Sequence, residues 1–520
     1  MTAQGPGAPA PLLLRGAFLY PADPSDRVLP DGSLLVVDGR IAAIGEQRDV
    51  DAAVAALDPA QRAALRTVDG RRMLALPGFV NAHWHELFAT RLPFNGAFRP
   101  ASDREDRPGF LARGGDMHRT SAIFDSFHDM IAGLTPDEAE AIARFSMWTQ
   151  LRAGATTLGD VGSVNRPEAL AAAAVSLGMR CSVSTWAADA VCAPGESRFR
   201  RTRDTDALLA DVETLVKRCA ADTTGLLKAR PTAVYGTNMT DELGRGLAEL
   251  VSCHDTGFAS HIGAQRNEPA VIEQYYGATP VRRFADLGLL DERLMSVHTA
   301  FVDDEERKLL LDGRVHLSHS PAKYGGAGES AMSETRVIPD LRRAGLDVSL
   351  STDGQPLVFA GMAEQMRAAW QTHNELYADS TVVLPTDALA MATRTAARGL
   401  RWDDRIGSLE PGKEADFVLI RMDDWRYVHT PRPLETFLAT GGSRDIDTVV
   451  VGGRVLIEGG RSVLVDEEEL LAGYEEALRS FSVRCLGVEP EAVDRVYALS
   501  ARRRSDGSGT TAPDPIQEEK

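Results

Sequence analysis

Cysteine is scarce in this chain of 520 residues, and its five cysteines are scattered without any C-x-x-C spacing. An odd number of isolated cysteines encodes neither a disulfide framework nor a zinc ribbon, which favours a reducing compartment. No run of 18 apolar residues occurs, and the first twenty residues lack the basic start and the long apolar core of a signal peptide. We therefore expect a cytoplasmic protein without a membrane segment.

Positive charge is also in short supply, since 57 Lys and Arg face 75 Asp and Glu, a formal net charge of -18. Nucleic-acid binding draws its affinity from clustered Lys and Arg that neutralise phosphates, so this balance argues against a nucleic-acid partner. The length suits one large domain with a smaller one, and a core of that size needs no disulfides. We expect a small molecule as the partner.

The two ends of the chain have a β-rich texture that the middle lacks. Residues 11–75 contain short apolar runs with Asp-Gly pairs at 31–32 and 38–39, which are hairpin signals. Residues 405–465 repeat this texture in GSLEPGKEADFVLI and DTVVVGGRVLIEGG. The pattern predicts one composite β-sandwich domain built from both ends.

The middle, residues 76–404, alternates apolar β-branched runs with helical patterns. One helix should begin at the capping box of residues 135–138, with Pro at its first position, and run to Gly154. Eight strand-and-helix alternations are typical of a closed parallel barrel, so we expect an α/β fold with a (β/α)8 TIM-type catalytic barrel. The expected strands end near Val80, Leu158, Val183, Val234, Ala259, Val297, Leu317 and Leu350.

Three further segments have distinct composition. The stretch from Leu92 to about His128 is too long for an ordinary βα-loop and predicts a cover over the barrel or disorder. Residues 466–500 favour a C-terminal helical segment, and residues 501–520 have the composition of a disordered tail. The long first loop contains Arg99, Arg104, Arg107, Arg113 and Arg119, which hint at an anionic substrate group but are more often solvated.

The candidate metal ligands begin with His83 and His85 in LPGFVNAHWHE, at the end of the first barrel strand. Side chains at positions i and i+2 of a strand point the same way, so both imidazoles can reach one metal ion. One H-x-H pair is weak support alone, because such short motifs also occur by chance.

Further candidates stand at other strand ends, and the carboxyl ends of barrel strands converge on one face. A single histidine at a strand end is more often structural, but several aligned ends indicate one site. We interpret the histidines away from strand ends as ordinary helix or loop residues, namely His118, His128, His254, His373 and His429, and His316 as structural. The aligned candidates are His261, His298, His319 and Asp353.

Six ordered motifs, LPGFVNAHWHE, ASHIGAQRNE, SVHTAFVDDEE, LSHSP, STDG and GSLEPGKEADFVLI, resemble the amidohydrolase superfamily over residues 11–460. The branch it resembles holds guanine deaminase, S-adenosylhomocysteine deaminase and the triazine chlorohydrolases. The resemblance implies one divalent metal ion, zinc before iron, with a bound water whose pKa the metal lowers. It also implies a homodimer. The implied metal ligands are His83, His85, His261 and Asp353.

The resemblance also implies roles for the surrounding residues. Asp353 would take the proton of the water as general base, and His298 would orient the hydroxide or polarise the substrate. Substrate contacts are implied for His319, Trp84 and Glu268, with a structural role as the alternative for His319.

The chain departs from this pattern after its fifth strand. The deaminases carry a proton-shuttling glutamate three residues after the fifth-strand histidine, and Ala264 stands there. Glu268 and Glu86 are possible replacements, although strand alternation turns Glu86 away from His83 and His85. Both carboxylates could equally be structural or solvated.

Three hypotheses of function follow. The first is a metal-dependent hydrolase that attacks an electron-poor carbon, chiefly at the C–N bond of a heterocyclic amine. The second is a hydrolase of an amide, urea, carbamate or carbon-halogen bond in the same fold. The transition state of that reaction would need a second electrophile near the metal. The third, a catalytically degenerate member, is disfavoured because converging buried polar groups are costly to keep.

Overall fold

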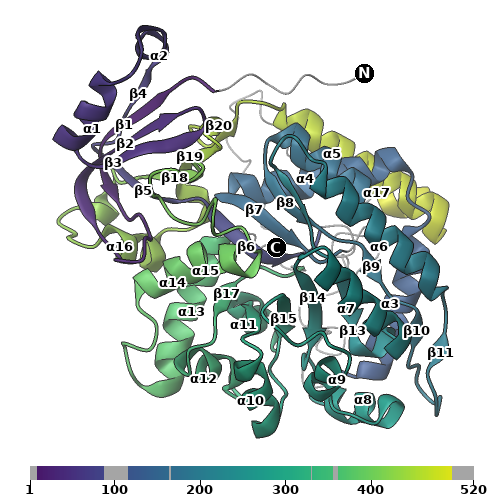
Figure 1. Ribbon diagram of the computed structural model, residues 1–520. Coiled ribbons are helices and arrows are strands. Elements are labelled where there is room, and N and C mark those ends of the chain that lie inside the picture. The colour runs from purple at the N-terminus through teal and green to yellow at the C-terminus, as the bar shows by residue number, and fades with distance from the viewer. Residues whose placement is uncertain (1–8, 87–114, 163–165, 330, 355–360, 495–520) are drawn as a thin grey trace, which may run out of the picture.

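The computed structural model describes residues 9–86, 115–162, 166–329, 331–354 and 361–494 (Figure 1). The expected loop from Leu92 to about His128 lies outside the described residues up to residue 114. Its last part was predicted wrongly, because α3 (Met117–Ile131) is a helix, capped by Asp116, whose side chain accepts from the His118 amide. The tail expected over residues 501–520 also lies outside the described residues.

Both ends of the chain contribute to one nine-stranded sheet, in the order β21-β20-β19-β18-β5-β1-β2-β3 with β4 beside β1. Helices α1 (Gln47–Ala55) and α2 (Pro59–Ala64) connect β3 to β4. The strands are β1 (Leu12–Leu19), β2 (Leu29–Val37), β3 (Arg40–Glu46), β4 (Arg66–Asp69), β5 (Met73–Pro77), β18 (Phe417–Arg421), β19 (Ile446–Val451), β20 (Arg454–Glu458) and β21 (Arg461–Ser462).

The two ends meet where β18 pairs antiparallel with β5, from Pro77 opposite Phe417 to Met73 opposite Arg421. Along β1, the first half pairs with β4 and the second half with β5. One hydrophobic cluster contains Leu14 and Leu34 from the first flank together with Leu419 from the second. Neither flank alone holds all the strands of this sheet, so its core depends on both. The exact domain boundaries stay a prediction.

The middle of the chain forms the (β/α)8 arrangement, and its strands fall where the sequence predicts them. Parallel pairing gives the orders β6-β7-β8-β12 and β9-β13-β14-β15-β16-β17, because the third and fourth strands are each interrupted. A parallel bridge between Trp84 and Asp353 joins the first strand to the last. The strands are β6 (Phe79–Trp84), β7 (Ala155–Asp160), β8 (Arg180–Val183), β9 (Trp186–Ala187), β12 (Leu227–Ala229), β13 (Thr232–Tyr235), β14 (Phe258–Ile262), β15 (Leu294–His298), β16 (His316–His319) and β17 (Val348–Leu350).

Helices surround these strands, and α17 lies along α4 on the outside of the barrel (Figure 1). The α4 helix begins at the predicted capping box, with Thr135 and Glu138 bonded reciprocally. A short ribbon, β10 (Ala190–Val191) with β11 (Arg200–Arg201), follows β9. The helices are α4 (Pro136–Arg152), α5 (Pro167–Leu177), α6 (Thr205–Ala220), α7 (Asp241–Cys253), α8 (Glu268–Tyr276), α9 (Pro280–Asp286), α10 (Asp304–Asp312), α11 (Pro321–Ala327), α12 (Val337–Arg343), α13 (Met362–Tyr377), α14 (Pro385–Met391), α15 (Arg394–Gly399), α16 (Pro433–Thr440) and α17 (Glu467–Leu486).

Across the described part of the chain, each helix is either too short or too polar to cross a lipid bilayer.

A buried ion-pair network joins the barrel to the sheet. Arg180 begins β8, and its guanidinium contacts Asp416 at 2.8 and 3.0 Å and Glu414 at 3.1 Å. Both carboxylates lie just before β18, and Asp416 also accepts from the Gly452 amide at 2.7 Å. This two-pronged arginine–carboxylate geometry orients one unit against the other.

Candidate metal centre

Two imidazoles meet at the end of the first barrel strand. His83 lies in β6, His85 follows it directly, and their Nε2 atoms are 3.0 Å apart. Strand alternation explains this meeting, because residues two apart share one face. His261, at the end of β14, completes a group of three whose donor atoms lie within 4.8 Å of one another.

The carboxylate of Asp353 lies between these imidazoles and a fourth one. Its Oδ1 is 3.9 Å from His83 Nε2 and 3.6 Å from His85 Nε2. Its Oδ2 lies 3.4 Å from His298 Nε2, and the donor atoms of His83, His298 and Asp353 lie within 4.8 Å of one another. The last barrel strand thus brings its aspartate to the ends of the first and sixth, as convergence of strand ends predicts.

The outer ring nitrogens of three of these histidines are held by neighbours. His85 Nδ1 lies 2.9 Å from the Gly162 carbonyl oxygen, and His261 Nδ1 lies 2.7 Å from that of Val234. Each Nδ1–H can donate to its carbonyl, which leaves the Nε2 lone pair directed at the centre. His298 Nδ1 is 2.9 Å from the Tyr324 hydroxyl. Such contacts orient imidazoles for metal binding.

Burial keeps three of these imidazoles neutral. It lowers the pKa of His83 and of His298 well below the ordinary value, and that of His261 to about 3. For Asp353, burial pushes the pKa up, but the charge of Lys323 and the nearby imidazoles outweigh it, so its pKa lies well below the usual range. Neutral imidazoles and an ionised carboxylate are the forms that bind metal.

Backbone strain marks the same place. His298 has a φ of 73° and Asp353 a φ of 59°, both in the left-handed region that side chains with a Cβ rarely adopt. Strain of this kind persists where the surrounding structure fixes a conformation, and it clusters at functional sites.

The donor set fits a divalent metal ion. Ligand atoms bonded at about 2.1 Å to one tetrahedral ion lie roughly 3 to 4 Å from each other. The measured separations of His83 Nε2 from His85 Nε2 and from Asp353 Oδ1, 3.0 and 3.9 Å, fall at the two ends of that range. Imidazole with carboxylate suits zinc or iron rather than magnesium or calcium, which prefer oxygen ligands.

Sequence reasoning missed a buried lysine in this centre. Lys323, in α11 just after β16, places Nζ 2.9 Å from Asp353 Oδ2 and 2.9 Å from Glu329 Oε1. Its side chain is 8% exposed and that of Glu329 is 2% exposed, so both charges are buried. Lysine is almost never buried without a charged partner. The sequence carried no periodic or motif signal for this pair.

His319 and His373 form a second imidazole pair behind the centre. Their Nε2 atoms are 3.0 Å apart, both rings are buried, and the Nδ1 atom of each has no hydrogen-bond partner. His373 lies on α13, where we had expected an ordinary helical histidine. The His319 ring also lies beside Tyr324, which contacts His298, so this pair supports the centre from behind.

The structure turns Trp84 and Glu268 away from the imidazoles. Trp84 lies in the main hydrophobic core with Leu158 and Leu170, because strand alternation points it opposite to its two histidine neighbours. Glu268 accepts from the amides of Gly263, Ala264 and Gln265 at 2.9, 2.7 and 3.3 Å. Burial raises its pKa to about 7 despite these bonds. Glu268 therefore holds the loop after β14, and substrate contact for either residue stays a prediction.

Ala264 itself packs into an apolar cluster with Trp186, Val234 and Tyr235 and is 2% exposed. The position where the deaminases carry a glutamate is thus filled here by hydrophobic packing.

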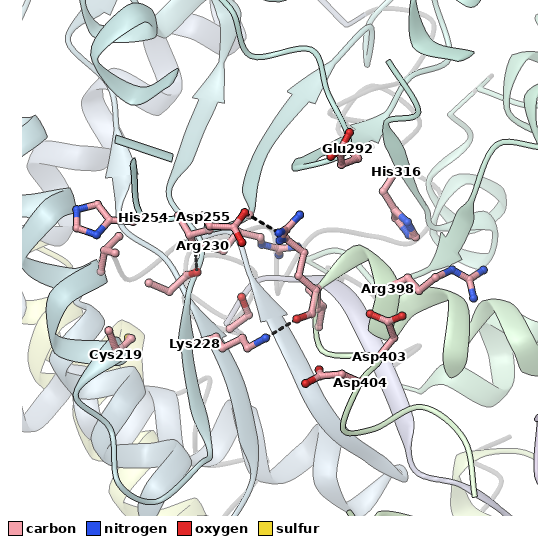
Figure 2. Close-up of a pocket in the computed structure, with 18 of the residues that line it drawn as sticks. Cys219, Lys228, Arg230, His254, Asp255, Glu292, His316, Arg398, Asp403 and Asp404 are labelled. Carbon is pink, nitrogen blue, oxygen red and sulfur yellow. Dashed lines mark hydrogen bonds and ion pairs between the residues drawn. The ribbon is translucent and has the colours of Figure 1, made fainter. Parts of the chain in front are cut away.

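A separate cavity of about 700 Å³ opens at the other end of the barrel. Gly257 and Asp347, which directly precede β14 and β17, line it, so it lies at the amino-terminal strand ends. Figure 2 shows Cys219 and His254 on one side of this cavity and His316 and Arg398 on the other. Active sites of such barrels lie at the carboxyl ends of the strands, so we place the chemistry at the opposite face, where the imidazoles converge.

A (β/α)8 barrel with histidines and an aspartate gathered at its carboxyl strand ends defines a metal-dependent hydrolase. The chain belongs to the amidohydrolase family, whose model matches residues 74–456.

Relatives and solved structures agree with this assignment. A 5-methylthioadenosine/S-adenosylhomocysteine deaminase of Moorella thermoacetica is 27% identical over 483 residues, covering 89% of this chain and 97% of its own. The zinc complex of the atrazine chlorohydrolase of Arthrobacter aurescens TC1 has a TM-score of 0.74 at 24% identity, covering 90% of this chain and 100% of its own. An adenosine deaminase of Xanthomonas campestris with bound zinc has a TM-score of 0.73 at 21% identity, covering 93% and 100%. These likenesses in structure concern the fold.

Proposed function

We propose that this protein is a metal-dependent hydrolase that directs water at an electron-poor carbon, chiefly at the C–N bond of a heterocyclic amine. The observation that carries the proposal is the convergence of three imidazoles on the Asp353 carboxylate, with His261 completing the group of His83 and His85. The names of the relatives, deaminases of adenosine derivatives and a triazine chlorohydrolase, support heterocycles as the substrate class.

In this proposal one divalent ion, zinc before iron, is held by His83, His85, His261 and Asp353. When bound, the ion supplies a water whose pKa is lowered towards 7. The carboxylate of Asp353 would be the group that accepts a proton there. His298 Nε2, 3.4 Å from Asp353 Oδ2, orients the attacking oxygen, and the Tyr324 hydroxyl fixes the ring of His298 through Nδ1.

The alanine at position 264 restricts the range of substrates that we propose. General acid catalysis typically accelerates a step by about 10² to 10⁴, and the glutamate that performs it in the deaminases is missing. We infer a poor deaminase of guanine- or adenosine-like substrates that acts on a compound with a good leaving group or its own proton source. Hydrolysis of an amide, urea, carbamate or carbon-halogen bond is the second candidate, and the buried Lys323 favours it as a second electrophile.

Metal content of the purified protein tests the ligand set. We expect one zinc or iron ion per chain in the wild type and loss of the metal and of all hydrolysis in His83→Ala, because a ligand is removed. His254→Ala is the matched control, since its ring lies outside the centre beside Glu213 and should keep the metal. Full metal occupancy in His83→Ala would refute the ligand assignment, and a metal-free wild type would favour the degenerate member.

A mass-spectrometric screen of purines, pyrimidines, triazines and amides, with detection of the leaving group, tests the bond class. Ammonia or amine release from heterocycles would support the first candidate. Wild-type deamination of guanine, adenosine or S-adenosylhomocysteine at about 10 per second, a typical enzyme turnover, would contradict the inferred weakness. Sedimentation of the same sample tests the proposed homodimer, and the cytoplasmic location stays a prediction.

A further inference from the structure

The two oxygens of Asp353 face different surroundings. Oδ1 looks toward His83 and His85 at 3.9 and 3.6 Å. Oδ2 looks toward Lys323 Nζ at 2.9 Å and His298 Nε2 at 3.4 Å. A metal ion held by the first-strand histidines would therefore use Oδ1, while Oδ2 already carries a cation.

The ammonium of Lys323 lies among side chains of the kinds that bind metal ions. Besides Asp353 Oδ2, both oxygens of Glu329 contact Nζ, at 2.9 and 3.0 Å. His298 Nε2 reaches the same Asp353 oxygen. Two carboxylates and one imidazole are a sufficient protein ligand set for a catalytic divalent ion. Asp353 and Glu329 contact the lysine directly, and His298 adjoins Asp353 Oδ2 while also lying close to His83.

Burial makes this arrangement informative. As whole residues, Asp353, Glu329 and Lys323 are each 7% exposed, so water screens their charges poorly. Two carboxylates placed this close need a buried cation between them, because an unpaired buried charge is strongly destabilising. A lysine supplies that cation permanently, whereas a metal ion would supply it only when bound.

We propose that Lys323 takes the place of a second metal ion, so that the centre holds one divalent ion and one built-in cation. The proposal deepens the proposed function, on whose first metal site it rests. The ammonium occupies the space between Asp353 Oδ2 and Glu329 and repels any further cation there. With Oδ2 paired to Lys323, Oδ1 is the oxygen of Asp353 that would be left to face the first ion.

Counting metal ions tests the proposal without any substrate. Lys323→Ala opens the space and frees two carboxylates, so we expect two zinc ions per chain by elemental analysis after equilibration, against one in the wild type. The double variant Lys323→Ala with Glu329→Gln removes a ligand of the new site and should return to one. Lys323→Met, neutral but of similar length, fills the space and should stay at one.

Cobalt shows where the added ion lies. In cobalt-loaded Lys323→Ala we expect magnetic coupling between two neighbouring ions by electron paramagnetic resonance, which surface-bound cobalt would not give. A second ion in the wild type, or a single ion in folded Lys323→Ala, would overturn the proposal, as would two uncoupled ions. Lys323→Ser replaces Lys323→Ala if that variant does not fold. A wild type without any metal would instead defeat the proposed function.

Discussion

Histidines in this barrel share burial but differ in their neighbours. Those of the metal centre face one another and a carboxylate, whereas His316 begins β16 at the opposite end. Its Nε2 has no hydrogen-bond partner, and its ring is so close to Gly399 that a side chain at that position would strike it. Burial lowers the pKa of His316 to about 4, so this imidazole stays neutral in the folded protein.

This histidine should make the protein less stable in acid. The unfolded chain takes up its proton near pH 6.5, but the folded chain only near 4, so stability falls as the pH drops through that window. Between pH 7 and pH 5 the contribution is about 2 kcal/mol. Between pH 7 and pH 5, the free energy of unfolding should fall by about 2 kcal/mol less in His316→Gln than in the wild type. Denaturant unfolding at both pH values measures this difference. An equal loss in both proteins would contradict the assignment.

The sequence predicted the residues of the centre that stand at strand ends and missed those that do not. His83, His85, His261, His298 and Asp353 each end or follow a strand, and parallel topology brings strand ends together. Lys323 reaches the centre from one helix, and His373 reaches His319 behind it from another, where no strand rule applies. Substrate contact by Trp84 stays a prediction, although strand alternation points its side chain away from the face that its two histidine neighbours share.

At the scale of elements, Glu138 connects two helices. Glu138 is the third residue of α4, and its side chain accepts from the Thr135 amide at 2.8 Å. In return, Thr135 Oγ1 accepts from the Glu138 amide at 3.2 Å. Glu138 Oε1 accepts from the Ser480 hydroxyl on α17 at 2.7 Å, and Arg484 of that helix pairs with Oε2, the oxygen that also accepts from Thr135. The capping box could be predicted from four consecutive residues, but its contact with α17 joins segments too far apart to predict.

Two substitutions separate these contributions. Thr135→Ala should cost about 1 kcal/mol of stability, the usual worth of a helix cap. Glu138→Ala removes the cap and both bonds to α17, so we expect about 2 kcal/mol and faster proteolytic cleavage within α17. Thermal unfolding and limited proteolysis measure the two effects. Equal cleavage of α17 in both variants would show that Glu138 does not anchor that helix.

At the scale of the whole molecule, Arg180 holds the barrel and the composite sheet together. Its side chain is 2% exposed and that of Asp416 is 3% exposed. Breaking a buried pair by removing one partner typically costs about 3 to 5 kcal/mol, because the other charge stays buried. Hairpin signals predicted that both flanks are β-rich, but no local signal predicted this contact between β8 and the turn before β18.

We expect Arg180→Met to lose about 3 to 5 kcal/mol and to unfold in two steps, because the sheet and the barrel lose their charged junction. The double variant Arg180→Met with Asp416→Leu should regain part of that loss, since fewer charges stay buried without partners. Denaturant unfolding followed by circular dichroism and by tryptophan fluorescence measures both. A single unchanged transition in Arg180→Met would show that the junction contributes nothing to cooperativity.

The pairing of β5 with β18 also sets the timing of folding on the ribosome. About 340 residues separate Pro77 from its partner Phe417. At roughly 5 to 20 residues per second, a ribosome needs roughly 20 to 70 seconds to synthesise that interval. During it one edge of β5 has no strand beside it, and an open strand edge is a template for pairing with other chains. We therefore expect the nascent first flank to keep this open edge, and to be a target for chaperones, until translation reaches the last fifth of the message.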